Sequence, residues 1–380
     1  MKKEIKLSFI NNLEHNKKSD WDWIQVIVGP RQVGKTTGIQ QYLEGLQVEE
    51  YHYASADGPI LKGPEWLVEQ WLTLSKKSSD GVLVIDEVQK IEKWSEALKN
   101  LWDQQKRKPV KIKVIVLGSS SLEIQKGLSE SLTGRFVLHK VYQWNFSESL
   151  EGYGLGLDEF LKFGGYPGSY NLRSDLVKWL SYVKESIVDT VIGRDILQLS
   201  RVKSPALFRQ CFDLACSYGG QEISYTKLLG QLQDKGNVDL IKHYLELFEG
   251  AFLLKQLFKY SNKKTLSRSS SPKILPLCPS LYTITKDADL DEESRGRAFE
   301  IAVGCELARL PGSLYYWREG NKEVDYVYVF GKKLFAIEVK SGRKKAAKGL
   351  VAFKNHFPNA IVMLITPDNF STFRKELNII

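Results

Sequence analysis

The chain has 380 residues, of which 43% are hydrophobic, so it exceeds the usual size of one domain and about two or three domains are expected. Its 54 basic residues outnumber its 45 acidic residues, and the net charge of +9 favours polyanionic partners such as nucleic acid, although a merely solvated basic surface is equally common. No apolar run reaches about 18 residues and the first residues are too polar for a signal peptide, so we expect a soluble, cytoplasmic protein with no membrane partner.

The first predicted strand, residues 24–28, runs directly into GPRQVGKTT and then into a segment compatible with a helix. This order satisfies G-x-x-x-x-G-K-[ST], in which glycines permit a turn whose backbone amides surround phosphate and the following helix adds its positive N-terminal end. Lys35 is expected to reach the β- and γ-phosphates, and Thr36 to bind Mg²⁺. The residues predicted to bind ATP are Gly29, Pro30, Arg31, Gln32, Val33, Gly34, Lys35, Thr36 and Thr37.

The next motif, GVLVIDEVQKIEKW, is a predicted apolar strand that ends in two acids, at the edge where an α/β sheet presents ligands. Asp86 is placed to hold Mg²⁺ and Glu87 to polarise the attacking water. A P-loop-like string also arises by chance, but the strand and the Asp-Glu pair downstream make chance a poor explanation.

A third predicted strand, KIKVIVLGSSS, ends in hydroxyl groups. Ser119 and Ser120 are candidates to touch the γ-phosphate or the water, and serine after a strand is equally ordinary turn chemistry. Arg135 follows Gly134 and is a candidate transition-state cation, acting in its own chain or from a neighbouring subunit. The second case requires a homo-oligomer. The alternative is a surface arginine at a helix end.

The strings GPRQVGKTT, VLVIDEVQK, VIVLGSSS, LTGR, FGGYP and GRDI together resemble those of prokaryotic AAA-type ATPases fused to a C-terminal domain of unclear function. The resemblance covers almost the whole chain. It implies an α/β fold with an ASCE P-loop ATPase core (1–148), a helical lid (149–203), a winged-helix-like segment (204–275) and a nuclease-like, restriction-endonuclease-type C-terminal domain (276–380). The two Walker motifs are specific only to P-loop ATPases in general, whereas the later strings point to this group.

The middle of the chain opens with a glycine-rich and aromatic-rich stretch after Glu148, which indicates a domain edge. Residues 174–200 have apolar side chains at helical spacing and are predicted to form the lid over the nucleotide. Arg194 is a candidate lid arginine that reaches phosphate, and a structural pairing of Arg194 with Asp195 is the alternative.

Residues 205–260 have the pattern of a winged helix. Ser224 is a predicted N-cap, and Lys235-Gly236 a predicted turn between two helices. Lys242 and His243 would face a groove if DNA were bound, although such modules equally often contact proteins.

The basic, serine-rich stretch SNKKTLSRSSSPK follows and is predicted to be a wing or mobile loop. Its Lys263, Lys264 and Arg268 are candidates for phosphate contact or simply solvated. The resembling proteins usually carry an acid in the next strand, whereas ILPLCPSLYT has none.

The segment EVDYVYVFGKKLFAIEVK predicts a β-hairpin that turns at Gly331-Lys332. Asp325 would then lie opposite Glu338, and Lys340 would share a strand face with Glu338. The pattern D-x(12)-E-x-K resembles the PD-(D/E)XK nuclease core, in which a preceding amphipathic helix, here RGRAFEIAVGCEL, would place Glu300 inward.

These residues suit metal-assisted phosphodiester hydrolysis: Asp325 and Glu338 would hold Mg²⁺ and Lys340 would orient the water. The alternative is a salt-bridge network on an exposed hairpin. The apolar strands favour the nuclease-type fold, because burying three charges without a ligand is costly, but an intact-looking site can also serve only to grip a backbone. Arg343, Lys344, Lys345 and Lys348 follow as a phosphate track or a solvated face.

The cysteines Cys211, Cys216, Cys278 and Cys305 form no CxxC pair, so neither a zinc site nor a disulfide framework is predicted. The sequence therefore predicts an ATP- and Mg²⁺-dependent switch or motor whose C-terminal domain binds DNA and carries a candidate site for cutting it, with cleavage left open. The competing hypothesis is a nucleotide-controlled signalling or scaffold protein that breaks no strand.

Overall fold

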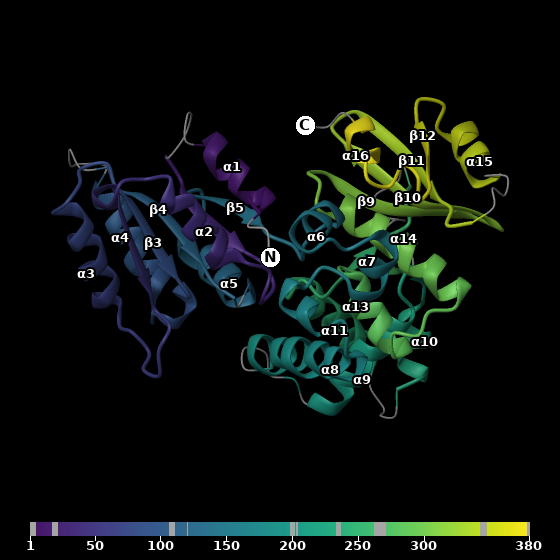
Figure 1. The fold of residues 1–380 in the computed structure, drawn as a ribbon, viewed down its shortest axis with the longest axis horizontal. Helices are drawn as coiled ribbons and strands as arrows, with labels where there is room; N and C mark the ends of the chain where they lie inside the picture. Colours follow the sequence, from purple (N-terminus) through teal and green to yellow (C-terminus); the bar gives the residue numbers. More distant parts are fainter. Residues whose placement is uncertain are drawn as a thin grey trace. The chain divides into compact units, whose positions relative to one another are not determined.

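A computed structural model describes residues 5–16, 22–105, 111–119, 121–197, 202, 204–232, 237–261, 271–342 and 348–377. The chain divides into two compact units (Figure 1). The N-terminal unit comprises residues 4–142 and 190–200, and the C-terminal unit comprises residues 1–3, 143–189 and 201–380. Residues predicted as a lid, 149–203, are thus shared between the two units, and the finer division into four parts stays a prediction.

Several residues singled out from the sequence lie outside the described part of the chain: Ser120, Lys235, Gly236, Lys263, Lys264, Arg268, Arg343, Lys344 and Lys345.

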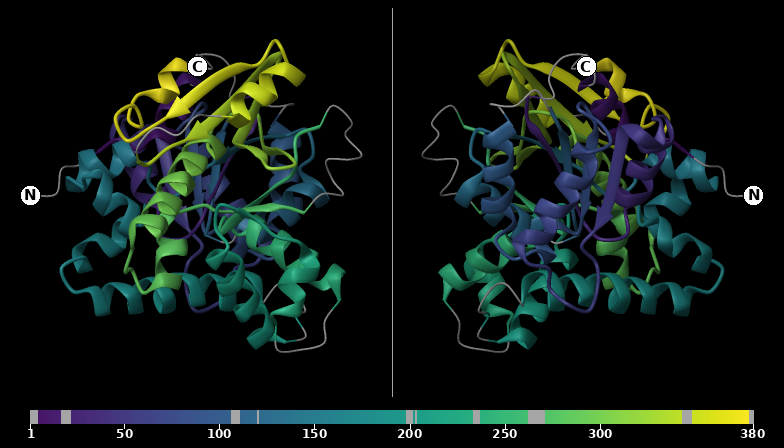
Figure 2. Two further views of the ribbon diagram at one scale, coloured as in Figure 1. Left: turned by 90° about the vertical axis from the view of Figure 1, so that its right-hand side faces the viewer. Right: turned by 90° about the vertical axis from the view of Figure 1, so that its left-hand side faces the viewer.

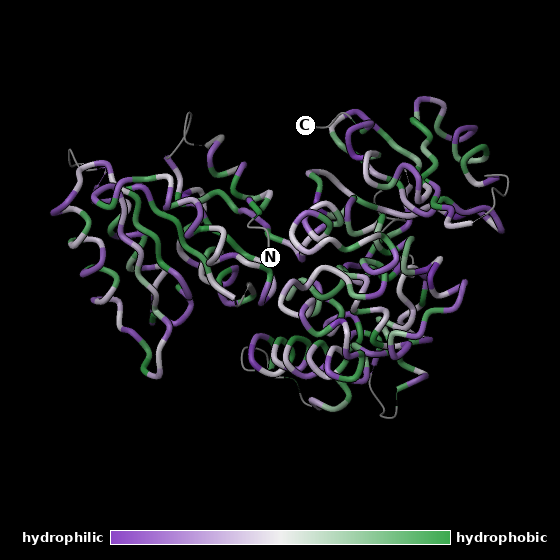
Figure 3. Tube along the Cα trace, in the orientation of Figure 1, coloured by the Kyte–Doolittle hydropathy of each residue, from purple (hydrophilic) through white to green (hydrophobic). Residues whose placement is uncertain are grey.

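The N-terminal unit contains a five-stranded sheet whose strands all run parallel in the order β2-β3-β4-β1-β5. The strands are β1 (Ile24–Val28), β2 (Tyr51–Ser55), β3 (Val82–Asp86), β4 (Lys113–Leu117) and β5 (Phe136–Lys140). Runs such as IQVIV and VLVID form central strands because β-branched residues suit a sheet that is covered on both faces, and Figure 3 shows hydrophobic colouring along these strands. The carboxyl ends of all five strands consequently meet at one edge.

Helices flank this sheet: α1 (Ser8–Asn16) packs on α2 (Lys35–Glu44), and α4 (Trp94–Gln105) packs on both α3 (Pro64–Ser75) and α5 (Ser121–Ser131). Proline opens α3 at a position where its missing N–H costs nothing. The remaining helical turns of the unit are η1 (Val48–Glu50), η2 (Val88–Lys90) and η5 (Val191–Ile196).

The C-terminal unit begins with short helices: α6 (Phe146–Tyr153), α7 (Leu157–Phe163), η3 (Pro167–Leu172), α8 (Leu176–Ser181) and η4 (Tyr182–Asp189). Asn145 caps α6, because its side chain accepts the amide of Glu148 at 2.8 Å while the Glu148 carboxylate accepts the amide of Asn145 at 2.8 Å. Gly154 ends the helix at φ 69°, a conformation that favours glycine.

A three-stranded antiparallel sheet of order β6-β8-β7 follows, combined with three helices. The elements, in chain order, are α9 (Pro205–Ser217), β6 (Gln221–Glu222), α10 (Tyr225–Gly230), α11 (Val238–Gly250), β7 (Leu254–Leu257) and β8 (Lys273–Pro276). Ser224 accepts the amide of Lys227 at 3.1 Å, which confirms the predicted N-cap. Lys242 and His243 are exposed on α11.

The last part contains a four-stranded mixed sheet of order β12-β11-β10-β9. Its elements are α13 (Pro279–Thr283), η6 (Ile284–Lys286), α14 (Glu292–Ala308), β9 (Ser313–Glu319), β10 (Lys322–Phe330), β11 (Lys333–Val339), α15 (Lys348–His356), β12 (Ile361–Ile365) and α16 (Phe373–Glu376). Phe330 pairs with Lys333 and Gly331 has φ 58°, so the predicted hairpin turn is confirmed.

Helix α14 differs from the prediction of an amphipathic helix. Its residues from Ala298 to Leu307 are all buried except Glu300, which is partly exposed. The reason is its position: it packs against β9, β10 and β11 on one side and against α7, α13 and β8 on others (Figure 2). Glu306 in this range is buried and paired, with Arg374 at 3.0 Å.

Candidate nucleotide site and an acidic cluster

The loop between β1 and α2 has the backbone that the two glycines of the motif, Gly29 and Gly34, were expected to allow. Gly34 has φ 89° at the start of α2, in the left-handed region that favours glycine. A Cβ atom on Gly29 would lie 2.1 Å from the carbonyl oxygen of Val141, so no larger residue fits there. Both glycines are therefore required by the shape of the loop.

Lys35 is buried, and its Nζ donates to the carbonyl oxygens of Gly29, at 2.9 Å, and Pro30, at 2.6 Å. Burial lowers the pKa of Lys35 to about 8, although the nearby carboxylates of Glu87 and Asp86 oppose this shift. The ammonium thus lies against the loop with only neutral oxygens as direct partners, where an incoming phosphate would compete for it.

The predicted Mg²⁺ ligands lie next to each other at the same sheet edge. The Thr36 hydroxyl donates to Oδ2 of Asp86 at 2.9 Å, and the Tyr53 hydroxyl donates to the same oxygen at 2.7 Å. Burial and this hydrogen bond raise the pKa of Tyr53, so it stays a donor. Hydroxyl and carboxylate oxygens are the ligands that Mg²⁺ prefers, so Thr36 and Asp86 fit such an ion.

Glu87 is held by two neighbours. Its Oε2 accepts from the Ser119 hydroxyl at 2.9 Å and from the side-chain amide of Gln89. Glu87 has φ 52°, an unusual backbone for a residue with a side chain, which indicates local strain at this position. Ser119 therefore contacts the candidate base, whereas the sequence had suggested the γ-phosphate or the water as its partner.

Arg31, inside the P-loop, forms a bidentate ion pair with Asp195 of η5. Nε lies 2.8 Å from Oδ2 and Nη2 lies 2.7 Å from Oδ1. The expected pairing of Arg194 with Asp195 is wrong: Asp195 is buried against Arg31, while Arg194 is exposed. Consecutive residues on a helix point in different directions, which accounts for the difference.

Arg135 lies at the opposite edge of the sheet from the P-loop. Its carbonyl oxygen accepts the amide of Ile24 at 2.9 Å, at the start of β1, whereas the P-loop follows the end of β1. Its guanidinium is bound to Asp103 through contacts of 3.0 and 2.9 Å. The structure therefore does not bring Arg135 to the phosphate loop of its own chain, and a role in a neighbouring subunit stays a prediction.

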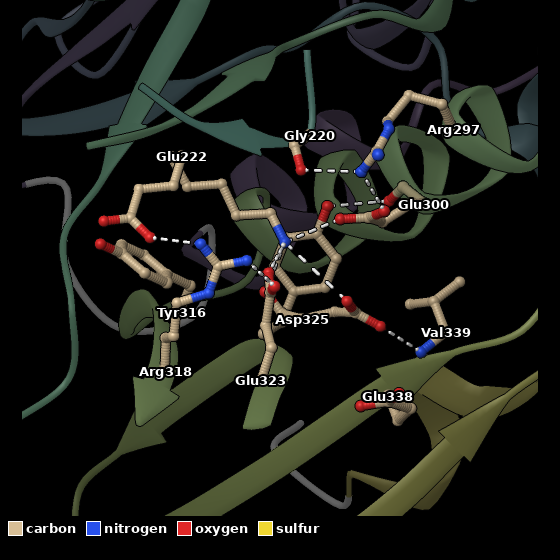
Figure 4. Close-up of polar contacts among 12 residues, drawn as sticks. Gly220, Glu222, Arg297, Glu300, Tyr316, Arg318, Glu323, Asp325, Glu338 and Val339 are labelled. Atoms are coloured by element: carbon tan, nitrogen blue, oxygen red, sulfur yellow. Dashed lines mark hydrogen bonds and ion pairs between the residues drawn. The ribbon is translucent and has the colours of Figure 1, made fainter. Parts of the chain in front are cut away.

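A second group of charged residues lies inside the C-terminal unit, where α14 meets β8 and β10. Nζ of Lys273 is 2.7 Å from Oε1 of Glu300, 3.4 Å from Oε1 of Glu323 and 3.9 Å from Oδ1 of Asp325. Figure 4 shows Glu300, Glu323 and Asp325 converging on this point. We call Lys273, Glu300, Glu323 and Asp325 the acidic cluster.

The lysine of the acidic cluster is almost inaccessible to solvent, with 1% of its side chain exposed. Burial alone would lower the pKa of Lys273, but Glu300, Asp325 and Glu323 raise it above its ordinary value. The pKa of Asp325 is raised to about 7. Burial is the main cause, the nearby Glu300 carboxylate is the second, and the Lys273 ammonium opposes the shift. The ammonium and the carboxylates therefore depend on one another for their charged states.

The hairpin brings the predicted nuclease-type residues together. Tyr326 pairs with Ile337, so Asp325 and Glu338 flank this pair on opposite strands, as predicted. Glu338 Oε1 accepts from Lys340 Nζ at 2.5 Å, and Oε2 is buried without a hydrogen-bond partner among the described residues. The Val339 amide donates to Asp325 Oδ2 at 2.7 Å. Glu338 is buried, which disagrees with an exposed salt-bridge hairpin.

Among the described residues, no third ligand side chain joins Asp325 and Glu338 in a metal-binding group, so the expected metal pair stays a prediction. Across the residues that the structure describes, no three histidine, cysteine, aspartate or glutamate side chains are grouped so that they could hold a metal ion. The ammonium of Lys273 lies near both Glu300 and Asp325 and supplies positive charge there, while Glu338 is paired with Lys340.

Five contributing residues were not found from the sequence: Tyr53, Gln89, Asp195 as a partner of Arg31, Lys273 and Glu323. Only two of them had a usable signal. Gln89 follows Glu87 by two positions in a tight turn, and Lys273 opens an otherwise apolar strand, where a charged side chain needs a buried partner.

All four cysteines are buried and unbonded to one another. Among the described helices, none combines the length and the apolar character needed to cross a bilayer.

Comparison with protein families assigns separate parts of the chain. Residues 22–150 match the model described as AAA domain. Residues 155–288 and 295–379 match two models described as domains of unknown function, DUF8612 and DUF4143. The chain therefore contains an AAA ATPase-like domain around its P-loop.

Two relatives are similar along most of the chain. The uncharacterized protein MJ1544 of Methanocaldococcus jannaschii is 25% identical over 346 residues, which covers 83% of this chain and 74% of the relative. An uncharacterized protein of Haemophilus influenzae is 24% identical over 345 residues, covering 84% and 83%, respectively.

Solved structures with partial similarity include a variant of Thermotoga maritima RuvB, with a TM-score of 0.34 and 17% identity over 65% of this chain and 87% of that chain. AMPPCP-bound DnaA from Aquifex aeolicus has a TM-score of 0.32 and 15% identity over 63% and 86%, respectively. At TM-scores this low, the similarity supports no conclusion about function.

Proposed function

We propose that this protein binds and hydrolyses ATP with Mg²⁺ in its N-terminal unit. The observation that supports this most directly is the pairing of Thr36 with Asp86 beside Lys35, on a glycine-shaped loop between a buried strand and a helix. No other group of described residues combines an anion-binding loop with oxygen ligands for a hard cation.

Each residue has a defined part in this proposal. Lys35 exchanges its loop carbonyls for the β- and γ-phosphates, and Thr36 and Asp86 hold the metal. The metal, when bound, neutralises charge on the phosphates. Glu87 orients the attacking water, and Ser119 and Gln89 fix the direction of its carboxylate.

Lys35→Ala tests this function. We expect ATP turnover to be lost while circular dichroism and the thermal midpoint show a folded protein. Calorimetric titration of wild-type protein with ATP and Mg²⁺ should give a binding isotherm that the variant lacks. Unchanged hydrolysis in the variant would contradict the site assignment.

Control of DNA binding is the second element of the proposed function. The order α9-β6-α10-α11-β7-β8 with a β6-β8-β7 sheet supports the winged helix that we propose for this segment. Lys242 and His243 are exposed on α11, which would be the second helix of its helix pair. The net charge of +9 is consistent with a polyanionic partner. Binding to duplex DNA should weaken steeply with salt, and Lys242→Ala should reduce it.

The competing function is a nucleotide-controlled scaffold in which the C-terminal unit holds a protein partner. The exposed face of α11 favours neither, because Lys242 is already paired with Asp239 at 3.1 Å. Electrophoretic mobility shifts over single-stranded, duplex and branched DNA, each with and without ATP, discriminate the two. Absence of any shift, combined with ATP-dependent capture of one protein, would favour the scaffold.

A homo-oligomer belongs to the proposal only through Arg135. If Arg135 of one subunit stabilises the transition state in another, turnover per subunit should rise with protein concentration, and Arg135→Ala subunits should lower the activity of wild-type subunits when mixed. We do not include strand cleavage, because Glu300, Asp325, Glu338 and Lys340 lie together but an ammonium occupies their neighbourhood.

A further inference from the structure

We propose that the ammonium of Lys273 is the permanent cation of the acidic cluster, so that this nuclease-like site takes up no divalent metal ion. The inference is independent of the ATPase function, since it rests only on residues of the C-terminal unit. It gives the hairpin residues a structural part in place of a catalytic one.

Lys273 is surrounded by oxygen atoms from two elements of the C-terminal unit. Its Nζ contacts a carboxylate from α14 and two from β10, lies 3.3 Å from the carbonyl oxygen of Asp325 and sits 5.3 Å from the centre of the Tyr326 ring. These partners surround the ammonium on several sides, as ligands surround a bound ion. An isolated buried charge is costly, so this set of partners is what keeps the lysine charged in the interior.

The backbone on both sides of Lys273 is hydrogen-bonded to the neighbouring chain segment, which holds the Cα atom of Lys273 in place. Just before it, the Pro272 carbonyl accepts the amide of Ile223 at 3.0 Å. Just after it, the Ile274 carbonyl accepts the amide of Gly220 at 2.7 Å. The Cα of Lys273 is therefore held in the sheet, and a movement of its side chain away from the cluster would cost the ammonium its carboxylate partners.

Two arginines form further ion pairs with the glutamates of the acidic cluster. Arg297 Nη1 lies 2.9 Å from Glu300 Oε2, and Arg318 Nη2 lies 2.6 Å from Glu323 Oε2. Figure 4 shows both guanidinium groups turned toward these carboxylates. Glu300 and Glu323 each have two cationic partners, although Lys273 is shared with Asp325 and Arg318 with Glu222, so an added metal ion would meet cations already at both carboxylates.

A divalent ion shared by Glu300 and Asp325 would lie within about 4 Å of the Lys273 ammonium, where repulsion between the two cations is strong in a buried site. The remaining carboxylate, Glu338, has one oxygen paired with Lys340. Its other, unpartnered oxygen is a single ligand, too few to hold Mg²⁺ against this repulsion.

The charges also tie two sheets of the unit together. Arg318 on β9 bonds Glu222 on β6 at 3.0 Å and Glu323 on β10, while Lys273 joins β8 to β10 and α14. These ion pairs thus connect the three-stranded sheet to the four-stranded sheet. We assign this structural role to the acidic cluster.

Manganese binding without nucleotide tests the inference. Electron paramagnetic resonance titrations with Mn²⁺ should detect no site in wild-type protein that depends on Asp325. Lys273→Met should create one, with an affinity at least about a hundredfold higher than in wild type, because the repelling charge is gone. Lys184→Met is the matched control: it removes a lysine paired with Asp287 in the same unit but away from the cluster, and should leave Mn²⁺ binding unchanged.

The thermal midpoint is a second measurement, and it also shows whether the Lys273→Met variant is folded. Mn²⁺ should raise its thermal midpoint and leave that of wild type unchanged. If the single variant does not fold, Lys273→Met combined with Glu300→Gln removes one charge of each sign, and the double variant should fold and bind Mn²⁺ more tightly than wild type.

Two outcomes would overturn the inference. One is a Mn²⁺ site in wild-type protein that Asp325→Asn abolishes, which would show that the lysine does not exclude metal. The other is a folded Lys273 variant, single or double, whose Mn²⁺ affinity and thermal midpoint match the wild-type response.

Discussion

The nucleotide site and the acidic cluster both combine carboxylates with a buried lysine, but they arrange the charges differently. In the nucleotide site, Lys35 lies against neutral carbonyl oxygens, and the Asp86 carboxylate accepts from hydroxyl groups. In the acidic cluster, Lys273 lies directly between the carboxylates. Carboxylates with neutral donors remain able to bind a metal ion, whereas carboxylates that share an ammonium already have a cation that would repel the metal.

The pKa shifts of the two lysines express the same contrast. Burial lowers the pKa of Lys35 to about 8, because its direct partners are uncharged. Burial acts on Lys273 too, but Glu300 and the neighbouring acids raise its pKa above the ordinary value. The first lysine therefore gains from an external anion, and the second gains nothing further.

The largest expected effect is on the stability of the C-terminal unit. Lys273→Met leaves the acids of the cluster without their shared cation, so the free energy of unfolding should fall by about 3–5 kcal/mol. Lys35→Met removes a buried ammonium with neutral partners and should change it by less than about 1 kcal/mol. Urea denaturation followed by tryptophan fluorescence measures the free energy of unfolding of both variants. Equal losses of stability would mean that the two buried lysines do not differ in this way.

The next largest effect is on catalysis. Lys35→Ala should lower the rate of ATP hydrolysis by more than about a hundredfold, because charge on the transferred phosphate loses one of the cations proposed to stabilise it. Lys273→Met, if it folds, should retain most of the activity. The exposed Lys77→Ala is the control for a general effect of lysine removal. A similar loss in all variants would mean that the assay reports folding.

The nucleotide loop and the hairpin could be predicted from the sequence because their geometry is local. Gly29 and Lys35 are six positions apart in one motif, and a turn at Gly331 determines that Asp325 faces Glu338. Such pairings follow from the strand period and the turn alone.

Contacts between distant segments could not be predicted in the same way. Arg31 and Asp195 are separated by 164 positions, and the helix of Asp195 returns to the N-terminal unit after the chain has built part of the other. Lys273 opens an otherwise apolar strand, which indicates a buried partner but not its identity. Nothing in KILPLC shows which buried partners its side chain meets; that depends on how β8 packs against α14 and β10.

A smaller effect is expected at the Arg31–Asp195 pair. Asp195→Asn keeps the shape but removes the charge, so the free energy of unfolding of the N-terminal unit should fall by about 1–3 kcal/mol. Asp239→Asn, at the exposed pair with Lys242, should have no measurable effect. Equal results for both would indicate that the buried pair contributes no more than a surface one.

The smallest effect, and the one that separates the two lysines most directly, is the pH dependence of ATP binding. Because the pKa of Lys35 is about 8 in the free protein, its ammonium is present below that pH and is lost as the pH rises through it. Phosphate favours the charged form, so the Kd for ATP with Mg²⁺ should be constant below about pH 8 and rise by up to about tenfold per pH unit above it, with proton uptake on binding. Calorimetry in two buffers of different ionisation enthalpy measures both quantities.

The matched variant for this measurement is Lys35→Arg, whose guanidinium stays charged over the whole range, so its residual binding should not change with pH. A constant Kd without proton uptake in wild-type protein between about pH 7 and about pH 9 would mean that Lys35 keeps its charge without phosphate. Its neutral carbonyl partners would then suffice to hold a buried ammonium, and the distinction from Lys273, whose charge depends on carboxylates, would no longer rest on charge state.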